Sequence, residues 1–408
     1  MAATVELLDL QPAAIEHVDR VLFDQTRGQL AFRRARDLLS LDDEHCDSFL
    51  ILEFIDNVDD ALAMLARRPL GTRRILLPDA RDQALVWGLR KAGLALVTGR
   101  PGPAKPVTAI EDVAVRPEQL PEYVAGLRAI LEPLQVEASY YGHAAAGLLH
   151  VRPILDLHKG QDIRTFRRIA EDVATLVKRF RGSLAGEHGV GIARSEFLED
   201  QLGPELMRAT RALKEAFDPA GLLNPGKIVP DRAGRLDFRI DRNLRQGAGH
   251  TISLPFVPVL GFVEKDGSFV GNLEQCNGNG LCLKNVPVMC PTYIVTHEEI
   301  MSTRGRANTI RAALERRLGS SVDALLSPEL EAALGPCLSC KACKTECPSS
   351  VDMALLKAEL LHARHRQAGV PLVDRMIASA DLLGRFGCAA SPFANAAIRS
   401  SAIRHLME

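Results

Sequence analysis

The first part of the chain alternates between two hydrophobic patterns. Short, nearly continuous apolar runs at residues 48–55 and 148–157 are typical of buried strands. Between residues 163 and 180, apolar side chains recur at spacings of three and one, so they form one stripe on a helix that Gly182 can end. The pattern predicts a mixed α and β domain over residues 1–230.

The second part of the chain has a different pattern. Residues 231–275 are richer in glycine, proline and charge and predict a connector, with a hairpin at Glu264-Lys-Asp-Gly267. After Cys276 the strand pattern fades. Helices are expected at 300–318, 328–334 and 353–368, and amphipathic helices from Arg375 onward. We therefore expect an α+β fold, with an all-helical ferredoxin-type domain over residues 276–408.

Composition narrows the function classes. With 408 residues, 47% of them hydrophobic and 25% charged, the chain can form two or three soluble globular domains. A net charge of −1 and 5% aromatic residues give no footprint for nucleic acid. The longest uncharged stretch, 246–263, contains two prolines, so no transmembrane segment is expected. Any membrane contact would be peripheral, at the inner face.

The cysteines carry the most specific signal. The run Cys337-Leu-Ser-Cys340-Lys-Ala-Cys343-Lys-Thr-Glu-Cys347-Pro places three thiolates at intervals of three, followed by a Cys-Pro pair. This spacing lets the first three cysteines bind one 4Fe-4S cluster, while the fourth points toward a second cluster. Cys290, also followed by proline, is expected to complete the first cluster.

A second cluster is predicted at Cys276, Cys282 and Cys347, with Asn279 where a middle cysteine would be expected. It could be a 3Fe-4S cluster, or a 4Fe-4S cluster with a non-cysteine ligand. Zinc sites usually present two separated cysteine pairs instead. Disulfides are disfavoured because the chain has nine cysteines, an odd number, and because no signal peptide is recognisable. Both observations indicate a reducing, cytoplasmic compartment. Cys46 and Cys388 stand alone and are predicted to be small buried side chains.

Two histidine motifs lie in the first domain. His143 and His150 are seven residues apart in Gly-His-Ala-Ala-Ala-Gly-Leu-Leu-His, and Glu187-His188 lies between glycines. Two imidazoles and one carboxylate can form a three-ligand site for a zinc- or manganese-like ion, with positions left open for a substrate. By spacing alone, buried core histidines are the more frequent explanation.

These motifs, followed by Phe217-Asp-Pro-Ala-Gly-Leu-Leu-Asn-Pro-Gly-Lys227, resemble the C-terminal domain of the FAD-linked oxidases. That family includes D-lactate, glycolate and D-2-hydroxyglutarate dehydrogenases of the vanillyl-alcohol-oxidase type. The resemblance covers roughly residues 1–230. The downstream cysteines are similar to the fused flavin and iron–sulphur branch of the family, in which Ser302-Thr-Arg-Gly-Arg306 also has a counterpart.

The resemblance implies a role for each matching residue. His143, His150 and Glu187 become metal ligands and His188 the base; Arg90 and Lys105 would hold the substrate carboxylate, and Asn224, Gly226 and Lys227 would approach FAD. The alternative for Arg90 and Lys105 is an ordinary solvated surface charge. The alternative for the segment 224–227 is a plain Pro-Gly turn. Many relatives carry Gly, Asp and Asn where Ala145, Ala146 and Leu148 stand here, so the polar lining between the histidines is missing.

The resemblance also implies a function. We expect an FAD-dependent D-2-hydroxy-acid dehydrogenase of the D-lactate or D-2-hydroxyglutarate class that produces a 2-oxo acid and passes electrons through the clusters to a quinone or a redox protein. No glycine-rich pyrophosphate loop is evident, so FAD would be shared with a flavin-binding domain or subunit. The alternatives are an iron–sulphur electron-transfer subunit without its own active site and, with less support, a structural metal-binding protein.

Overall fold

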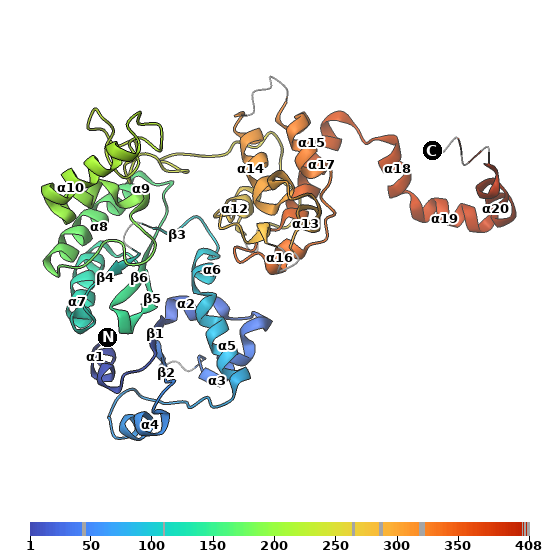
Figure 1. Ribbon diagram of the computed structural model, residues 1–408. Helices are drawn as coiled ribbons and strands as arrows, with labels where there is room; N and C mark the ends of the chain where they lie inside the picture. The colour runs from blue at the N-terminus through green and yellow to red at the C-terminus, as the bar shows by residue number, and fades with distance from the viewer. Residues whose placement is uncertain are drawn as a thin grey trace. The chain divides into compact units, whose positions relative to one another are not determined.

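The computed structural model describes residues 1–408 except 43–45, 109–110, 263–265, 285–288, 318–322, 402, 404 and 406–408. The chain forms two compact units. The first comprises residues 1–251, 262–281 and 345–351, and the second comprises residues 252–261, 282–344 and 352–408. Of the segment expected to be a connector, 231–275, residues 231–251 and 262–275 therefore cluster with the first unit. The segments of both units can be followed by colour in Figure 1.

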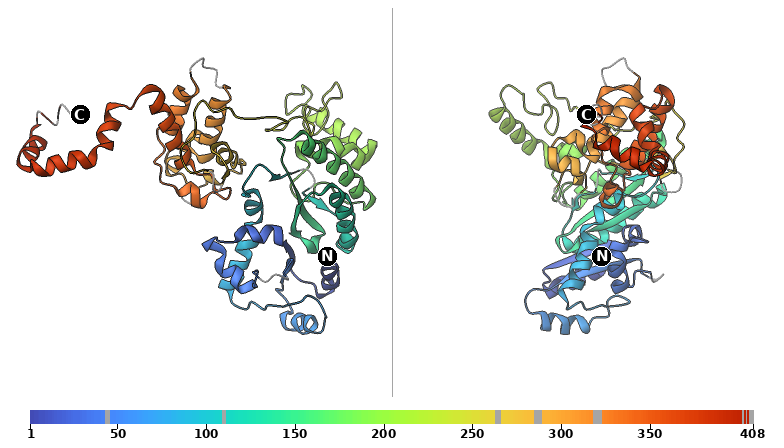
Figure 2. Two further views of the ribbon diagram at one scale, coloured as in Figure 1. Left: turned by 180° about the vertical axis from the view of Figure 1, so that it is seen from behind. Right: turned by 90° about the vertical axis from the view of Figure 1, so that its right-hand side faces the viewer.

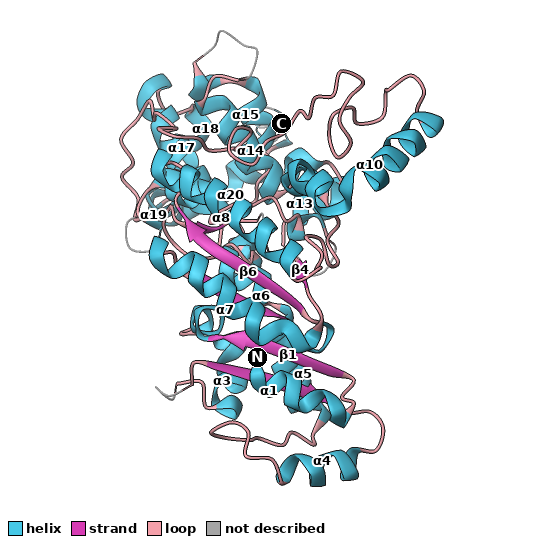
Figure 3. Cartoon of the chain, turned by 90° about the vertical axis from the view of Figure 1, so that its left-hand side faces the viewer, coloured by secondary structure: helices cyan, strands magenta, loops and turns pink. Residues whose placement is uncertain are grey.

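The first unit is built on a six-stranded sheet of antiparallel pairs, in the order β2-β1-β5-β6-β3, with β4 also paired to β6. The strands appear in magenta in Figure 3. Their bounds are β1 Ala14–Asp19, β2 Ser48–Glu53, β3 Lys105–Pro106, β4 Val113–Ala114, β5 Ala138–His143 and β6 Leu148–Leu155. The strands predicted at 48–55 and 148–157 are thus confirmed.

Helices cover both faces of this sheet (Figures 1 and 2). The helices of this unit are α1 Ala2–Leu7, α2 Arg20–Phe23, α3 Arg33–Leu39, α4 Val58–Ala66, α5 Ala80–Lys91, α6 Gly93–Thr98, α7 Leu120–Leu131, α8 Gly160–Arg179, α9 Gly191–Arg194, α10 Leu198–Phe217 and α12 Phe269–Glu274, and not all of them contact the sheet. Because successive strand residues point to opposite faces, Leu149 and Val151 pack into the larger core with α7 and α8. Val18 and Tyr141 face the smaller core with α2, α3, α5 and α6.

Helix α8 shows why the sequence pattern was informative. Its buried residues include Phe166, Ile169, Val173 and Val177, which lie on the predicted apolar stripe. Burying such a stripe against a sheet, rather than intrinsic helix propensity, supplies most of the stability of a helix in a protein. The helix at 163–180 is therefore confirmed.

The second unit is helical, and no strand occurs among its described residues. The helices that follow α12 are α13 Pro291–Thr296, α14 Thr303–Leu314, α15 Pro328–Leu334, α16 Ala342–Glu346, α17 Met353–Ala368, α18 Leu372–Ala378, α19 Ala380–Ala389 and α20 Ser391–Arg399. The helices predicted at 328–334 and 353–368 are confirmed. The one expected at 300–318 begins later, because Ser302 is its N-cap and accepts a hydrogen bond from the backbone of Gly305.

Three expectations turn out differently or fall outside the described residues. Cys388 was expected to be buried, but it is exposed on α19; Cys46 is half-buried against the smaller core. Residues 264 and 265 of the hairpin predicted at Glu264-Lys-Asp-Gly267 lie outside the described part of the chain, and the described residues that follow it form α12 instead of a strand. Among the helices that are described, none combines the length and the apolar composition that crossing a lipid bilayer requires.

Candidate functional site

The register of the sheet places three of the functional candidates on one face. Glu16 on β1 pairs with His143 on β5, and Tyr141 on β5 pairs with His150 on β6. Because every second residue of a strand shares a face, the side chains of Glu16, His143 and His150 emerge on the same side of the sheet. This is the face that α5 covers with Arg90, whose guanidinium binds Glu16.

Two glycines make the connection between the histidines possible. At Gly142 an added Cβ would lie 2.7 Å from the carbonyl oxygen of Leu148 and 2.9 Å from the Cα of Leu149. At Gly147, where φ is +70°, a Cβ would lie 1.9 Å from the carbonyl oxygen of Val115. Two residues between the histidines serve packing: Leu148 is buried, and Ala145 lies against the larger core.

Asp112 holds the Glu187-His188 loop in place. Its carboxylate accepts hydrogen bonds from the backbone N–H of Glu187 at 3.1 Å and of His188 at 2.8 Å, and its carbonyl oxygen accepts one from Gly186 at 2.7 Å. Asp112 is fully buried. A buried carboxylate with several N–H donors fixes a loop strongly, because both partners would be costly to leave unpaired.

The side chains converge on one atom. The Oε1 atom of Glu187 lies 3.5 Å from Nε2 of His143, 3.1 Å from Nε2 of His150 and 3.5 Å from Nε2 of His188. The rings of His150 and His188 stack with centroids 5.0 Å apart. Asp112, His150, Glu187 and His188 each offer one possible ligand atom, and these atoms lie within 4.8 Å of one another. Ligands about 2.0–2.1 Å from one ion are separated by about 3–3.5 Å, so this donor set fits a divalent ion.

Outer contacts orient the two imidazoles. Nδ1 of His143 lies 2.7 Å from Glu16 Oε1, and Nδ1 of His150 lies 3.0 Å from the carbonyl oxygen of Glu111. Because a carbonyl can only accept, Nδ1 of His150 carries the proton and Nε2 is left as a lone-pair donor. The hydrogen bond to Glu16 raises the pKa of His143, whereas burial lowers the pKa of His150.

The two cations predicted to hold the substrate lie in different places. Arg90 is buried, donates to Glu16 from Nε at 2.7 Å and lies over the ring of Tyr141 at 5.4 Å, so it joins the site through Glu16. Lys105 on β3 pairs with Leu155, five residues along β6 from His150, a separation of about 17 Å. The structure therefore does not bring Lys105 to the histidines. Its amino group donates to Gln275, and burial lowers its pKa to about 8.

The turn predicted to approach FAD packs on the segment that follows it. Asn224 and Gly226 have φ of 48° and 69°. The carbonyl of Gly226 accepts a hydrogen bond from the backbone of Asp237 at 2.8 Å, and Nζ of Lys227 lies 3.8 Å from the centroid of the Phe238 ring. These contacts explain the shape of the turn, and a role in flavin binding stays a prediction.

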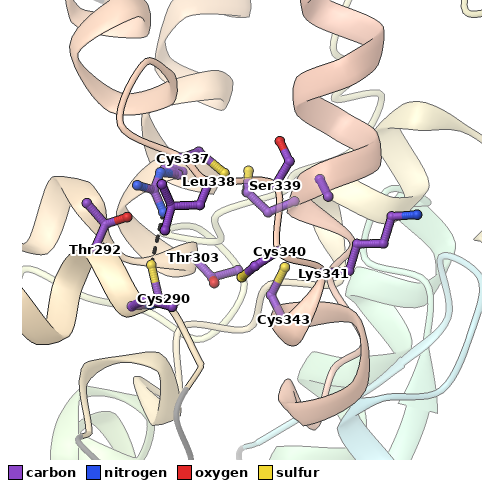
Figure 4. Close-up of a pocket in the computed structure, with 13 residues that line it drawn as sticks. Cys290, Thr292, Thr303, Cys337, Leu338, Ser339, Cys340, Lys341 and Cys343 are labelled. Atoms are coloured by element: carbon purple, nitrogen blue, oxygen red, sulfur yellow. Dashed lines mark hydrogen bonds between the residues drawn. The ribbon is translucent and has the colours of Figure 1, made fainter.

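The second unit brings four of the cysteines around one pocket (Figure 4). Cys290, Cys337, Cys340 and Cys343 all line it. Ser339 and Lys341 lie directly before and after Cys340 and have positive φ of 52° and 64°. Left-handed conformations at residues other than glycine are costly and persist where the surroundings require them. Here they curl the loop so that its thiols face the pocket.

Arg306 is the charged neighbour of these thiols. Its Nη1 donates to the sulphur of Cys290 at 2.9 Å, and its Nε donates to the carbonyl oxygen of Ala333 at 2.7 Å. The side chain is buried. Burial raises the pKa of Cys343 to about 11, so its thiolate needs a cationic partner, which an iron–sulphur cluster would supply. The pocket therefore fits a cluster bound by four thiolates.

The close packing of α14 explains the rest of the 302–306 motif. A Cβ at Gly305 would lie 1.9 Å from the carbonyl oxygen of Glu299, so a side chain there would push α14 away from the pocket. The backbone N–H of Arg304 donates to the sulphur of Cys282 at 3.3 Å. The sequence showed the motif but gave no hint that it contacts sulphur atoms.

The three cysteines predicted to bind the second cluster are divided between the units. Cys276 and Cys347 belong to the first unit and Cys282 to the second, so the second cluster stays a prediction. Asn279, which stands where a cysteine was expected, uses its side-chain oxygen to accept a hydrogen bond from the backbone of Leu281 at 3.0 Å.

Sequence reasoning missed the residues that support the histidine site. Glu16, Glu111 and Asp112 contact it from positions far away in the chain, with Asp112 75 residues before Glu187. Glu111 also binds Arg194 at 2.7 Å. None of them stands in a recognisable local motif, and only the paired acids at 111–112 before an apolar run could have drawn attention.

Among known proteins, this chain is similar to D-2-hydroxyglutarate dehydrogenases. That of Haemophilus influenzae is 28% identical over 94% of this chain and 41% of its own length, and that of Escherichia coli is 31% identical over 79% and 34%. The D-lactate dehydrogenase of Archaeoglobus fulgidus is 32% identical over 31% of this chain and 28% of its own length. The chain thus spans at most about two fifths of the length of these relatives.

Two family models match the chain. The 4Fe-4S dicluster domain matches residues 272–351, which contain all seven cysteines of the predicted clusters. The FAD linked oxidases, C-terminal domain, matches residues 1–228, which contain the histidine site. Since that match covers more than half of the chain, this protein belongs to the family of the FAD linked oxidases.

Proposed function

We propose that this chain is the substrate and iron–sulphur part of an FAD-dependent D-2-hydroxy-acid dehydrogenase of the D-2-hydroxyglutarate or D-lactate class. The family and the names of the relatives support this class of reaction. The observation that carries the proposal is the convergence of three imidazole Nε2 atoms, those of His143, His150 and His188, on one oxygen of Glu187.

His143, His150 and Glu187 would hold a divalent ion such as zinc or manganese. When bound, that ion supplies Lewis acidity, which lowers the pKa of a coordinated hydroxyl group. Nδ1 of His143 and of His150 stay engaged with Glu16 and with the carbonyl of Glu111 during the reaction, so both rings keep their orientation. The buried cation of Arg90 pairs with Glu16 and fixes its carboxylate beside His143.

His188 would accept the hydroxyl proton at Nε2. Its backbone is fixed by Asp112, and its Nδ1 lies 3.8 Å from a carboxylate oxygen of Glu111 and 3.8 Å from one of Asp112. These contacts would hold the ring in position while it takes the proton. The hydride would leave the carbon that carries this hydroxyl group. The substrate would thus lose one proton and one hydride and become a 2-oxo acid.

FAD is the hydride acceptor that the family uses, and we propose that a flavin-binding domain or subunit shares it with this chain. Asn224, Gly226 and Lys227 are the candidates for contacts to it, since their turn is preorganised by Asp237 and Phe238. Arg90 and Lys105 stay candidates for carboxylate binding. Lys105 could hold only a carboxylate far from the histidines, because it lies about 17 Å along β6 from His150, and its contact with Gln275 would have to break.

We further propose that two clusters carry the electrons away one at a time. Cys290, Cys337, Cys340 and Cys343 would bind a 4Fe-4S cluster, and Cys276, Cys282 and Cys347 a second 4Fe-4S or 3Fe-4S cluster. The acceptor would be a quinone or a redox protein. Clusters of this kind suit the reducing cytoplasm, and any contact with the inner face of the membrane would be peripheral.

The test is dye reduction by the chain assembled with a flavin-binding domain, with D-2-hydroxyglutarate and D-lactate as substrates. His188→Gln is expected to slow turnover about 10²- to 10⁴-fold without loss of the divalent ion. His150→Ala is expected to lose both the ion and the activity. His362→Gln, at an exposed position of α17, is the matched control and should behave like the wild type.

The same experiment separates the rival function. An electron-transfer subunit without its own active site has no use for the convergence on Glu187. If His188→Gln and His150→Ala both left dye reduction unchanged, the rival would stand and the proposed active site would be wrong.

A further inference from the structure

A second cluster of metal-binding side chains lies in the first unit, away from the site described above. His158, His250 and Glu274 each offer one possible ligand atom, and these atoms lie within 4.8 Å of one another. His158 follows the end of β6 that is opposite to His150, His250 lies in the segment after α10, and Glu274 is the last residue of α12. Three segments distant in sequence thus contribute one ligand each.

The distances suit a metal ion better than a direct hydrogen bond. Nε2 of His158 lies 3.4 Å from Oε2 of Glu274, which is longer than the usual 2.7–3.2 Å of an N–H···O hydrogen bond. Two ligand atoms that each lie about 2.0–2.1 Å from a tetrahedral zinc ion are about 3.4 Å apart. The rings of His158 and His250 lie nearly parallel at 27°, with centroids 6.5 Å apart.

Asp156 prepares His158 to bind a metal. Its Oδ1 lies 2.8 Å from Nδ1 of His158, so that nitrogen carries the proton and Nε2 faces Glu274. The carboxylate is itself buried and fixed, because it also accepts the backbone N–H of His158 at 3.2 Å and lies 3.4 Å from Nζ of Lys159. A carboxylate behind a histidine is the usual outer partner of a zinc ligand, since it fixes the ring and makes the nitrogen more basic.

Backbone contacts hold the other two ligands nearby. The N–H of Gly249 donates to the carbonyl oxygen of His158 at 2.9 Å, which places His250 next to His158. Helix α12 begins at a Ser268 cap and buries Phe269 and Leu273, which fixes its last residue, Glu274. Two residues later, the carbonyl oxygen of Cys276 accepts a hydrogen bond from Arg245 at 2.9 Å.

We propose that His158, His250 and Glu274 bind a zinc ion that fastens the segment after α10, and α12, to the end of β6. Two imidazoles and one carboxylate are donors that zinc prefers, whereas magnesium and calcium prefer oxygen ligands. A water molecule would fill the fourth position. Because Glu274 stands two residues before Cys276, the ion would also steady the start of the cysteine-rich region.

The test counts zinc in the complete, anaerobically purified chain, with iron and sulphide measured to confirm that the cluster cysteines are occupied. The protein is incubated with Zn²⁺ and freed of excess ion by gel filtration. In a His143→Ala/His150→Ala background, which removes the other site, one equivalent of zinc is expected to remain. Adding His250→Ala or Glu274→Gln should remove it, while His362→Gln, at an exposed position, should not.

Proteolysis gives a second measurement that does not depend on the folding of the His250 and Glu274 variants. Arg239, Arg242 and Arg245 lie shortly before His250 and are trypsin sites. In the same background, zinc at about one hundred times its Kd should lower the cleavable population about a hundredfold. Retention of zinc by folded His250→Ala and Glu274→Gln, or cleavage that zinc does not slow, would overturn the proposal and leave the three side chains as an ordinary polar contact.

Discussion

Glu16 joins Arg90 to His143: one of its carboxylate oxygens lies 2.7 Å from the arginine, and the other lies 2.7 Å from Nδ1 of the histidine. All three are brought together by pairing of β1 with β5 and by packing of α5 on the sheet. The buried arginine fixes the carboxylate, and the carboxylate orients the imidazole. Glu16 is therefore a positioning residue for a ligand rather than a ligand.

Glu16→Gln is expected to weaken divalent-ion binding about 10- to 100-fold, which is the usual effect of losing a charged outer partner. The measurement is a zinc or manganese titration of the folded chain, with circular dichroism to verify the fold. Glu53→Gln changes an exposed glutamate on the neighbouring strand and should bind as the wild type does. Equal affinity of both variants would contradict the role of Glu16.

The same substitution should change the pH dependence of metal binding. Because the hydrogen bond to Glu16 raises the pKa of His143, a proton competes with the metal at a higher pH than at an ordinary histidine. Affinity is full above that raised pKa and is lost as the pH falls through it. In Glu16→Gln this loss should occur at lower pH, which titrations at several pH values would detect as a shift in the midpoint.

The histidine site was predictable where its signal was local. The spacing of His143, His150, Glu187 and His188 was visible in the sequence, and the structure brings all four together. Asp112 and Glu16 were not predictable, because what makes them important is their register and a loop contact across the chain. Lys105 was placed by resemblance alone, and its pairing with Leu155 at the other end of β6 had no local signal.

The fold was predictable for a similar reason. Helices α8, α15 and α17 bury one periodic stripe or carry a clear cap, and both are properties of neighbouring residues. The short strands β3 and β4 have two residues each and no pattern of their own. They exist because β6 offers them backbone partners, which no reading of their own residues could reveal. Cys388 misled because a lone cysteine is usually buried, whereas α19 is exposed.

Gly142→Ala is expected to destabilise the first unit by about 1–3 kcal/mol, because the new Cβ would collide with the backbone of β6. Urea unfolding followed by the fluorescence of Trp87, the one tryptophan of the chain, measures this loss. Gly88→Ala is the matched control, since no atom lies within 4 Å of its Cβ position in α5. It should be neutral or raise stability by up to about 1 kcal/mol. A Gly142→Ala protein as stable as Gly88→Ala would contradict the close approach.

Asp19 should give the first unit a pH-dependent stability. Burial raises its pKa to about 6, although it accepts hydrogen bonds from Leu22, Ser139 and Tyr140. The folded state therefore binds the proton more tightly than the unfolded state, whose carboxyl titrates near 3.8. This contribution is fully present below the unfolded pKa and is lost as the pH rises through the folded one.

Relative to Asp19→Asn, the wild type should lose about 1 kcal/mol of unfolding free energy between pH 5 and pH 8. Urea titrations of both proteins at each pH, again followed by Trp87, provide the comparison. Asp47→Asn, at an exposed carboxyl next to Arg20, is the control and should follow the wild type. A constant difference between wild type and Asp19→Asn across this range would show that burial does not perturb Asp19.

Arg306 should raise the reduction potential of the cluster proposed at Cys290. Its guanidinium donates to the sulphur at 2.9 Å and adds a buried positive charge, and both favour the more negative, reduced cluster. Arg306→Lys keeps a charge but loses the planar fork that reaches Cys290 and Ala333 together, so the potential should fall. A redox titration followed by electron paramagnetic resonance measures the shift. Arg304→Lys, whose side chain binds Glu299 instead, should leave the potential unchanged. Equal potentials in the two variants would mean that the hydrogen bond from Arg306 has no influence on the cluster.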